Sequence, residues 1–247
     1  MSQIETLAEK PALTDKPLRL RPIDLLDRPF YFCMSLLVAL VVIYGFSRTV
    51  GPRLFHPPSP RPAVLYVHAV VFTGWLAFFI LQSALIRTRN VKVHRRLGWF
   101  GLALGISIVT VGVTTAIVIA RFRIREGETN AASFMAVPLF DMVAFSVTFA
   151  LAFYWRKKPE FHRRLMLVAT CALTAASFGR LMPLTWFYGG VDLLIFFGVL
   201  RDLIVTKRIH PVYLYGLPLL MLGQIATIYT VANSLPAWLK IAHSLLG

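Results

Sequence analysis

Long stretches of apolar residues, separated by short basic loops, dominate the chain. A transmembrane helix needs about 20 mainly apolar residues to cross about 30 Å of hydrocarbon. One stretch, 190–206, is weaker than the others because it contains Asp192, Arg201 and Asp202. We predict an all-α integral membrane bundle of about seven transmembrane helices, in the segments 29–47, 62–86, 97–120, 131–155, 165–189, 190–206 and 211–239.

The charged residues predict how this bundle lies in the membrane. Residues 1–28 mix acidic, basic and proline residues and lack the apolar core of a signal peptide. We therefore expect a cytoplasmic N-terminal tail, followed by a single transmembrane domain, 29–247. Lys and Arg gather in the tail and in alternate loops, which favours a cytoplasmic N-terminus in the inner membrane.

The amino-acid composition limits the kinds of molecule that the protein is expected to bind. The chain is 57% hydrophobic and carries a formal net charge of +15, but its basic residues lie in loops between apolar segments. A nucleic-acid surface would need a separate soluble domain, so we expect no nucleic-acid partner. Basic loops at a membrane surface instead indicate contact with anionic phospholipids.

The tetrapeptide His-Arg-Arg-Leu occurs twice, at residues 94–97 and 162–165, each time between a basic loop and an apolar run. Matching the two copies aligns the second and third predicted helices with the fourth and fifth. Each pair crosses the membrane and returns through a short loop. The pattern predicts a parallel repeat of two helical hairpins about an axis along the membrane normal.

Three interpretations of the repeated motif are open. The first is an interfacial anchor that touches lipid phosphates, and the second is binding of an anionic ligand such as haem propionates or a polar head group. In the third, the two histidines jointly ligate a b-type haem between the hairpins. A metal site is not expected, because neither CxxC nor HxxxH accompanies Cys33 or Cys171. The candidate residues are His94, Arg95, Arg96, His162, Arg163 and Arg164.

A second candidate site comprises four polar residues that fall inside predicted spans, in one layer of the outer half of the membrane. Polar groups at such depth mark function by default. In a functional site, Asp141 would pair with Arg180, and His68 would accept protons or bind a ligand. In a purely structural one, that pair would lock two helices, and His68 would bond a backbone carbonyl. The residues are His68, Asp141, Arg180 and Gln224.

The segments VHRRLGWFGLAL, VPLFDM and RKKPEFHRRLMLVAT resemble a widespread group of uncharacterised bacterial multi-pass membrane proteins, over roughly residues 63–185. This resemblance implies no particular reaction. Paired histidines on membrane helices are also distantly similar to cytochrome b561-type haem proteins and to small membrane factors of haem-copper oxidase assembly, which implies haem b as a cofactor. The chain departs from the b561 pattern because only His68 lies inside a span.

Two classes of function are therefore open. One is a membrane protein that binds a haem, a quinone or another small ligand in a redox-associated role. The other is a non-catalytic transporter, or an assembly or scaffold subunit of a membrane complex. A contact between Asp141 and Arg180, with a cavity that joins them to His68, would favour a functional outer site.

Overall fold

The computed structural model describes residues 22–57 and 59–247, with the backbone alone for residues 22–28, 53 and 54. All regular structure in that part of the chain is helical, as predicted. The elements are α1 (Pro22–Val50), the π-helical turn η1 (Gly51–Phe55), α2 (Val64–Arg87), α3 (Val91–Arg125), α4 (Ala131–Phe134), α5 (Ala136–Tyr154), α6 (Pro159–Ala172), α7 (Ala175–Leu181), α8 (Phe187–Thr206), α9 (Pro211–Ala232) and α10 (Pro236–Leu246).

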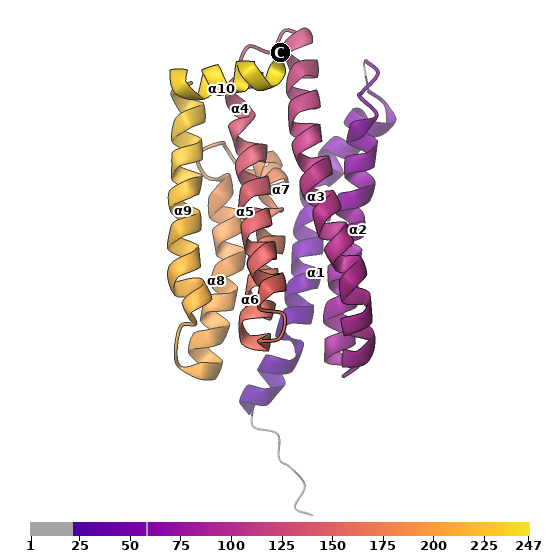
Figure 1. Ribbon diagram of the computed structural model, residues 1–247, viewed down its shortest axis with the longest axis vertical. Helices are drawn as coiled ribbons and strands as arrows, with labels where there is room; N and C mark the ends of the chain where they lie inside the picture. Colours follow the sequence, from indigo (N-terminus) through magenta and orange to yellow (C-terminus); the bar gives the residue numbers. More distant parts are fainter. Residues whose placement is uncertain (1–21, 58) are drawn as a thin grey trace, which may run out of the picture.

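The long helices run side by side in one elongated bundle, and α10 lies across one end of it (Figure 1). Within the described part, five helical segments are long and apolar enough to cross a membrane: Pro29–Val50, Val64–Arg87, Val91–Arg125, Ala131–Tyr154 and Pro211–Ala232. The bent pair α6–α7 makes a sixth if it counts as one span. The architecture is that of a multi-pass helical membrane protein.

The count of five or six spans differs from the predicted seven. The helix α8 lies lengthwise in the bundle (Figure 1), but it is not among the apolar spans. Its charged residues Asp192, Arg201 and Asp202 lower its hydropathy. Asp192 and Asp202 have polar partners on neighbouring helices, and Arg201 pairs with Asp202 of the same helix.

The first apolar span begins at Pro29, as predicted, although its helix α1 starts at Pro22; residues 1–21 of the predicted tail lie outside the described residues. Two other predicted boundaries differ. The predicted span 165–189 is broken, because α6 and α7 meet at an angle of 42°. At that break the Thr174 hydroxyl donates to the Cys171 carbonyl at 2.6 Å, a side-chain bond that bends helices. The predicted span 211–239 ends early, at a turn in which Ser234 has a φ of 45°.

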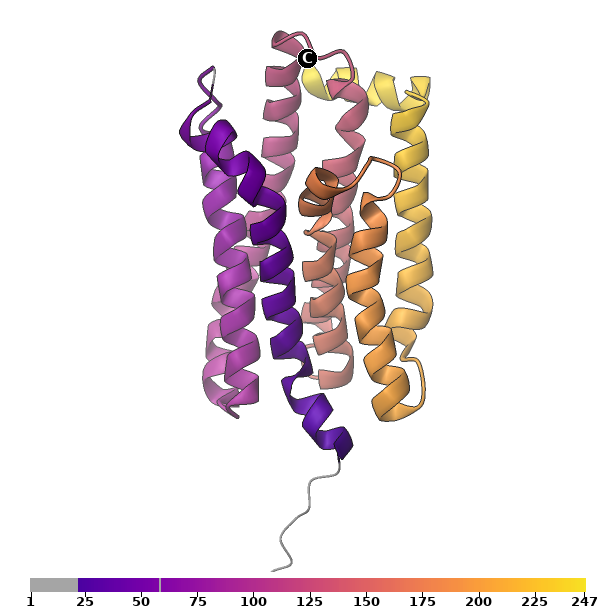
Figure 2. The same ribbon diagram turned by 180° about the vertical axis from the view of Figure 1, so that it is seen from behind.

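Two antiparallel hairpins, α2–α3 and α5–α6, pack against each other through α3 and α5, with α2–α3 at one edge of the bundle (Figure 1). Figure 2 shows α1, in indigo, along the outside of the bundle, where it contacts α2, α7 and α8. Large apolar side chains remain exposed on the outer helix faces, among them Leu40, Ile43, Val70 and Leu219. Such faces are suited to lipid. The proposed symmetry between the hairpins stays a prediction.

The turns α2–α3, α5–α6 and α8–α9 lie at the same end of the bundle, opposite α10 (Figure 1). We call this the basic end, because twelve basic residues lie in or beside these turns: Arg87, Arg89, Lys92, Arg95, Arg96, Arg156, Lys157, Lys158, Arg163, Arg164, Lys207 and Arg208.

Candidate functional site

The two histidines of the repeated motif meet at the basic end. His94 lies in the first turn of α3, and His162 lies in the first turn of α6. Their ring centroids are 6.3 Å apart, and the ring planes make an angle of 74°. Both side chains are half-buried. Residues that the sequence matched through the repeat are thus close neighbours in space.

Hydrogen bonding fixes one of these rings. The Nδ1 atom of His162 lies 2.9 Å from the carbonyl oxygen of Ala152 on α5. Because a carbonyl oxygen only accepts, Nδ1 must carry the hydrogen and donate. The other ring nitrogen, Nε2, is then left with its lone pair, which is the state required of a metal ligand.

The ring of His94 is less constrained by hydrogen bonds. The Nδ1 atom of His94 is buried and has no hydrogen-bond partner among the described residues. Gln82 of α2 donates from Nε2 to the carbonyl oxygen of His94 at 3.4 Å, but its own Oε1 is also buried without a partner in that part of the chain. Buried polar atoms are nearly always paired in native proteins. Two such atoms beside one histidine mark this position as a candidate binding site.

The donor set limits which metal group could bind. Residues 22–57 and 59–247 contain no group of three or more His, Cys, Asp or Glu side chains that could hold a metal ion. A zinc site takes at least three protein ligands. A haem brings four nitrogen ligands of its own, so two axial imidazoles are enough. The pair of histidines therefore fits a haem better than a bare ion.

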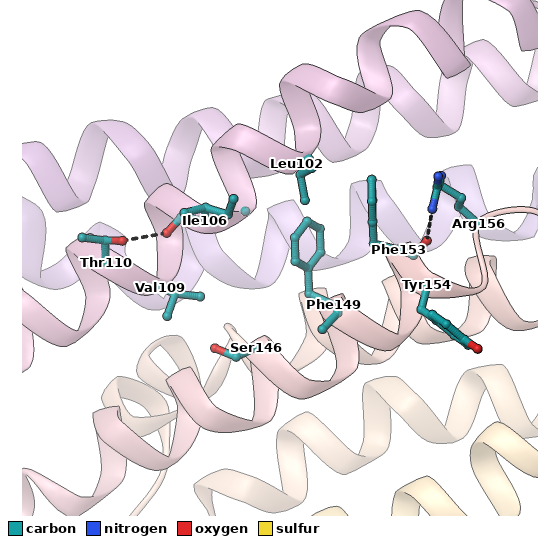
Figure 3. A pocket seen from close by; sticks show the side chains of 11 residues that line it. Leu102, Ile106, Val109, Thr110, Ser146, Phe149, Phe153, Tyr154 and Arg156 are labelled. Carbon is teal, nitrogen blue, oxygen red and sulfur yellow. Dashed lines mark hydrogen bonds between the residues drawn. The ribbon is translucent and has the colours of Figure 1, made fainter.

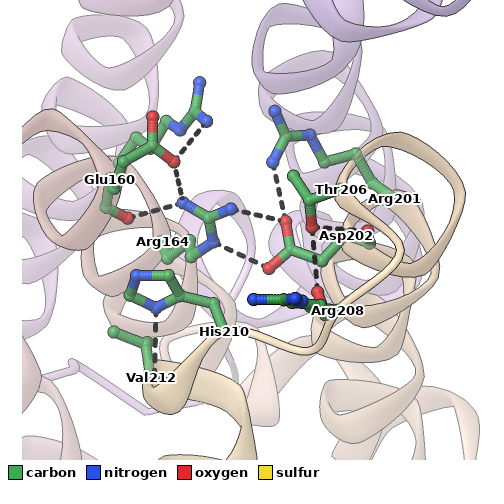
Figure 4. A network of polar contacts seen from close by, with 9 residues as sticks. Glu160, Arg164, Arg201, Asp202, Thr206, Arg208, His210 and Val212 are labelled. Atoms are coloured by element: carbon green, nitrogen blue, oxygen red, sulfur yellow. Dashed lines mark hydrogen bonds and ion pairs between the residues drawn. The ribbon is translucent and has the colours of Figure 1, made fainter.

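The arginines of the two motif copies have different surroundings. Arg95 and Arg96 are exposed at the basic end. Arg164, by contrast, is only 1% exposed and forms a two-fold ion pair with Asp202 of α8, with Nε–Oδ2 and Nη2–Oδ1 distances of 2.8 and 2.7 Å (Figure 4). Arg164 thus contacts protein groups and not the lipid phosphates expected of an anchor.

Further charges extend this ion pair into a network. Glu160 accepts from Arg163 and from Arg164, at 2.6 Å in each case. Arg201 donates to Asp202, also at 2.6 Å. Figure 4 shows how Glu160 and Asp202 flank the guanidinium of Arg164. The network joins α6 to α8, and it satisfies charges that would be costly to bury alone.

A third histidine at the basic end, His210, stabilises the start of a helix. His210 begins α9, and its Nδ1 accepts a hydrogen bond from the backbone N–H of Val212 at 3.2 Å (Figure 4). Burial lowers the pKa of His210, and the positive charge of Arg164 adds to the effect. A lowered pKa keeps the ring neutral and able to accept, so His210 caps its helix.

The four residues of the predicted outer site belong to separate contacts. Asp141 accepts a hydrogen bond from the Tyr188 hydroxyl at 2.9 Å. Gln224 donates to Asp192 at 3.0 Å. These two contacts join α8 to α5 on one side and to α9 on the other. They replace the pairing of Asp141 with Arg180 that the sequence suggested.

Arg180 and His68 lie elsewhere. Arg180 donates from Nε to the Thr49 hydroxyl at 3.0 Å, and its guanidinium stands 3.9 Å from the ring centroid of Phe46. His68 stacks on Phe72 with 3.9 Å between ring centroids. Its Nδ1 is buried, and among residues 22–57 and 59–247 it has no partner for the carbonyl bond expected of a structural histidine.

Sequence reasoning missed most of the partners: Gln82, Glu160, Tyr188, Asp192, Arg201 and Asp202. The two aspartates and Arg201 were noticed as interruptions of a span, but not as ion-pair or hydrogen-bond partners. The available signal was that charges of both signs recur on adjacent apolar segments. Tyr188 resembled an interfacial aromatic residue and carried no signal of its own.

A cavity of about 540 Å³ lies between α3 and α5, away from both predicted sites (Figure 3). Its lining is mainly apolar and contains none of the predicted site residues. The lining residues are Leu102, Gly105, Ile106, Val109, Thr110, Ser146, Phe149, Ala150, Phe153, Tyr154 and Arg156.

Comparison of the chain with models of protein families, with curated proteins and with solved structures finds no match. The resemblances suggested by the sequence motifs therefore stay predictions. Function has to be argued from the geometry of the sites.

Proposed function

We propose that the protein is a membrane haem protein in which His94 and His162 are the axial ligands of one b-type haem. The observation that carries this proposal is the 6.3 Å between the two ring centroids. Metal–imidazole bonds in proteins are about 2 Å long, so two rings at this separation could both hold one metal group between them.

The hydrogen bonds around the pair support the same function. A ligating histidine usually donates its second ring N–H to a carbonyl or carboxylate, as His162 does to Ala152. The exposed guanidiniums of Arg95 and Arg96 are at the same end of α3 as His94. They are suited to the haem propionates, since arginine binds carboxylates through paired N–H donors.

The ligand set also indicates a role. A haem held by two imidazoles would supply electron transfer. We therefore infer a redox-associated role. His162 would hold the group from α6, a helix that an ion pair joins to α8, and His94 would hold it from the α2–α3 hairpin.

An absorption spectrum tests the proposal. The full chain is expressed with haem supplied, purified in mild detergent, and measured before and after reduction with dithionite. We expect one haem per chain, with a Soret band that shifts on reduction. His94→Ala and His162→Ala should each lose most of the bound haem, because each removes an axial ligand.

His210→Ala is the matched control, since His210 is at the same end but its Nδ1 is occupied by Val212. This variant should keep the wild-type haem content. Absence of a Soret band from the wild-type protein would overturn the proposal. So would full haem content in both His94→Ala and His162→Ala.

A further inference from the structure

The cavity between α3 and α5 has the form of a groove for a hydrocarbon chain. Two of its three hydroxyl side chains are satisfied within their own helices: Ser146 donates to the Met142 carbonyl at 2.6 Å, and Thr110 donates to the Ile106 carbonyl at 3.0 Å. The remaining wall is apolar apart from Tyr154 and Arg156 at one end (Figure 3). Such a lining favours an apolar occupant with its polar end at Arg156.

Small residues make room for the groove. A Cβ atom at Gly105 would collide with the ring of Phe149, so glycine allows that ring to lie against α3. Ala150, on the next position of α5, is exposed. From Ser146 to Tyr154, where α5 ends, the groove follows the helix for about 12 Å, and Arg156 lies just beyond in the turn. That length is somewhat less than half of the hydrocarbon thickness of a bilayer, so the groove fits within one leaflet.

Charge at the open end selects the head group. The guanidinium of Arg156 is 4.5 Å from the ring centroid of Phe153 and 6.0 Å from that of Trp99. Arg156 also donates to the Phe153 carbonyl at 3.2 Å, which holds it at the end of the groove. Lys157 and Lys158 follow it and are exposed. An anionic group is favoured at this position.

We propose that this groove is a binding site for one anionic phospholipid of the surrounding membrane. One acyl chain lies between α3 and α5, and the phosphate meets Arg156. The site is separate from the histidine pair, so the lipid proposal does not depend on haem binding.

The test uses the full chain, purified in mild detergent and stripped of lipid. Phosphatidylglycerol or phosphatidylcholine is added, and native mass spectrometry counts the lipids retained. We expect one phosphatidylglycerol to be retained in preference to phosphatidylcholine. Arg156→Gln should reduce this preference about fivefold, the factor that corresponds to one basic residue at a membrane surface. Ala150→Trp should abolish specific retention by filling the groove.

Two matched variants serve as controls. Val147→Trp adds the same bulk to an exposed position of α5 outside the groove lining, and Lys240→Gln removes a charge at the opposite end of the bundle. Both should retain lipid like the wild type. Ala150→Leu repeats the test with a smaller side chain if the tryptophan variant does not fold. Unchanged retention in the folded Ala150 variant, or an unchanged preference in Arg156→Gln, would overturn the proposal.

Discussion

Asp202 accepts charged hydrogen bonds from Arg164 and Arg201, although its own side chain has no exposed surface. Taking a carboxylate out of water is costly, and bonds of this kind offset that cost only when the geometry is good. Here Arg164 reaches both carboxylate oxygens, and Arg201 adds a third bond. The stability of the basic end therefore depends on this one side chain.

Asp202→Asn should destabilise the protein by about 3–5 kcal/mol, because it removes the buried counter-charge that Arg164 and Arg201 share and leaves Arg164 with only the exposed Glu160. Glu160→Gln is the comparison, since Glu160 binds the same Arg164 from a side chain that is 56% exposed. Its loss should cost below about 1 kcal/mol, because water screens the pair. Thermal unfolding in detergent, followed by circular dichroism, measures both. Equal losses would contradict this account.

Some contacts of individual side chains could be predicted from the sequence, and others could not. The meeting of His94 and His162 followed from a repeated motif, because equivalent ends of two hairpins share one depth. The partner of Asp141 could not be predicted from the depth of the residues in the membrane. A helix can direct a side chain toward any of its neighbours. The orientation of α5 about its own axis therefore determines whether Asp141 contacts Arg180 or Tyr188. That orientation depends on packing over the whole helix.

The helices α1 and α7 come into close contact at Gly45. A Cβ atom there would lie 2.8 Å from the carbonyl oxygen of Ser177 and 2.9 Å from its Cα. Backbone atoms cannot turn aside as a flexible side chain can. The contact between these helices therefore requires glycine at this position.

Gly45→Ala should destabilise the bundle by about 1–3 kcal/mol through overpacking. Gly74→Ala is the matched control on α2, where an added Cβ meets nothing within 4 Å. It should be neutral or stabilising by about 0.5–1 kcal/mol, because alanine favours the helix. The two melting temperatures in detergent decide the matter. If Gly74→Ala is also destabilised, helix propensity does not determine the stability of the variant at this position.

The helices with the longest apolar segments were the easiest to predict from the sequence. The spans of α1, α2 and α3 appear as long uncharged runs, and the structure has helices there. The break between α6 and α7 was not foreseen, because a threonine bonded to its own helix leaves no break in hydropathy. The same limit applies to the turn before α10, where the apolar run continues into a helix that lies across the bundle.

At the scale of the whole molecule, the concentration of basic loops predicts that the basic end faces the cytoplasm. Two single-cysteine variants test this orientation on a Cys33→Ala background, in which Cys171 is buried. Asn233→Cys is at the end near α10 and should react with a membrane-impermeant thiol reagent in intact spheroplasts. Lys157→Cys should react only after the membrane is opened. The reverse pattern would invert the orientation.

The two motif copies differ in how firmly their helices are held. The second arginine of one copy, Arg164, ties α6 to α8, whereas its equivalent in the other copy, Arg96, is exposed. His162 therefore lies on a helix that a buried ion pair joins to α8, whereas the exposed Arg96 provides no buried contact of that kind for the helix of His94. We expect any change in the gap between the two imidazoles to come mainly from the α2–α3 hairpin. A bound group would then tighten that hairpin first, and amide hydrogen exchange in the first turns of α3 would slow while α6 stayed unchanged.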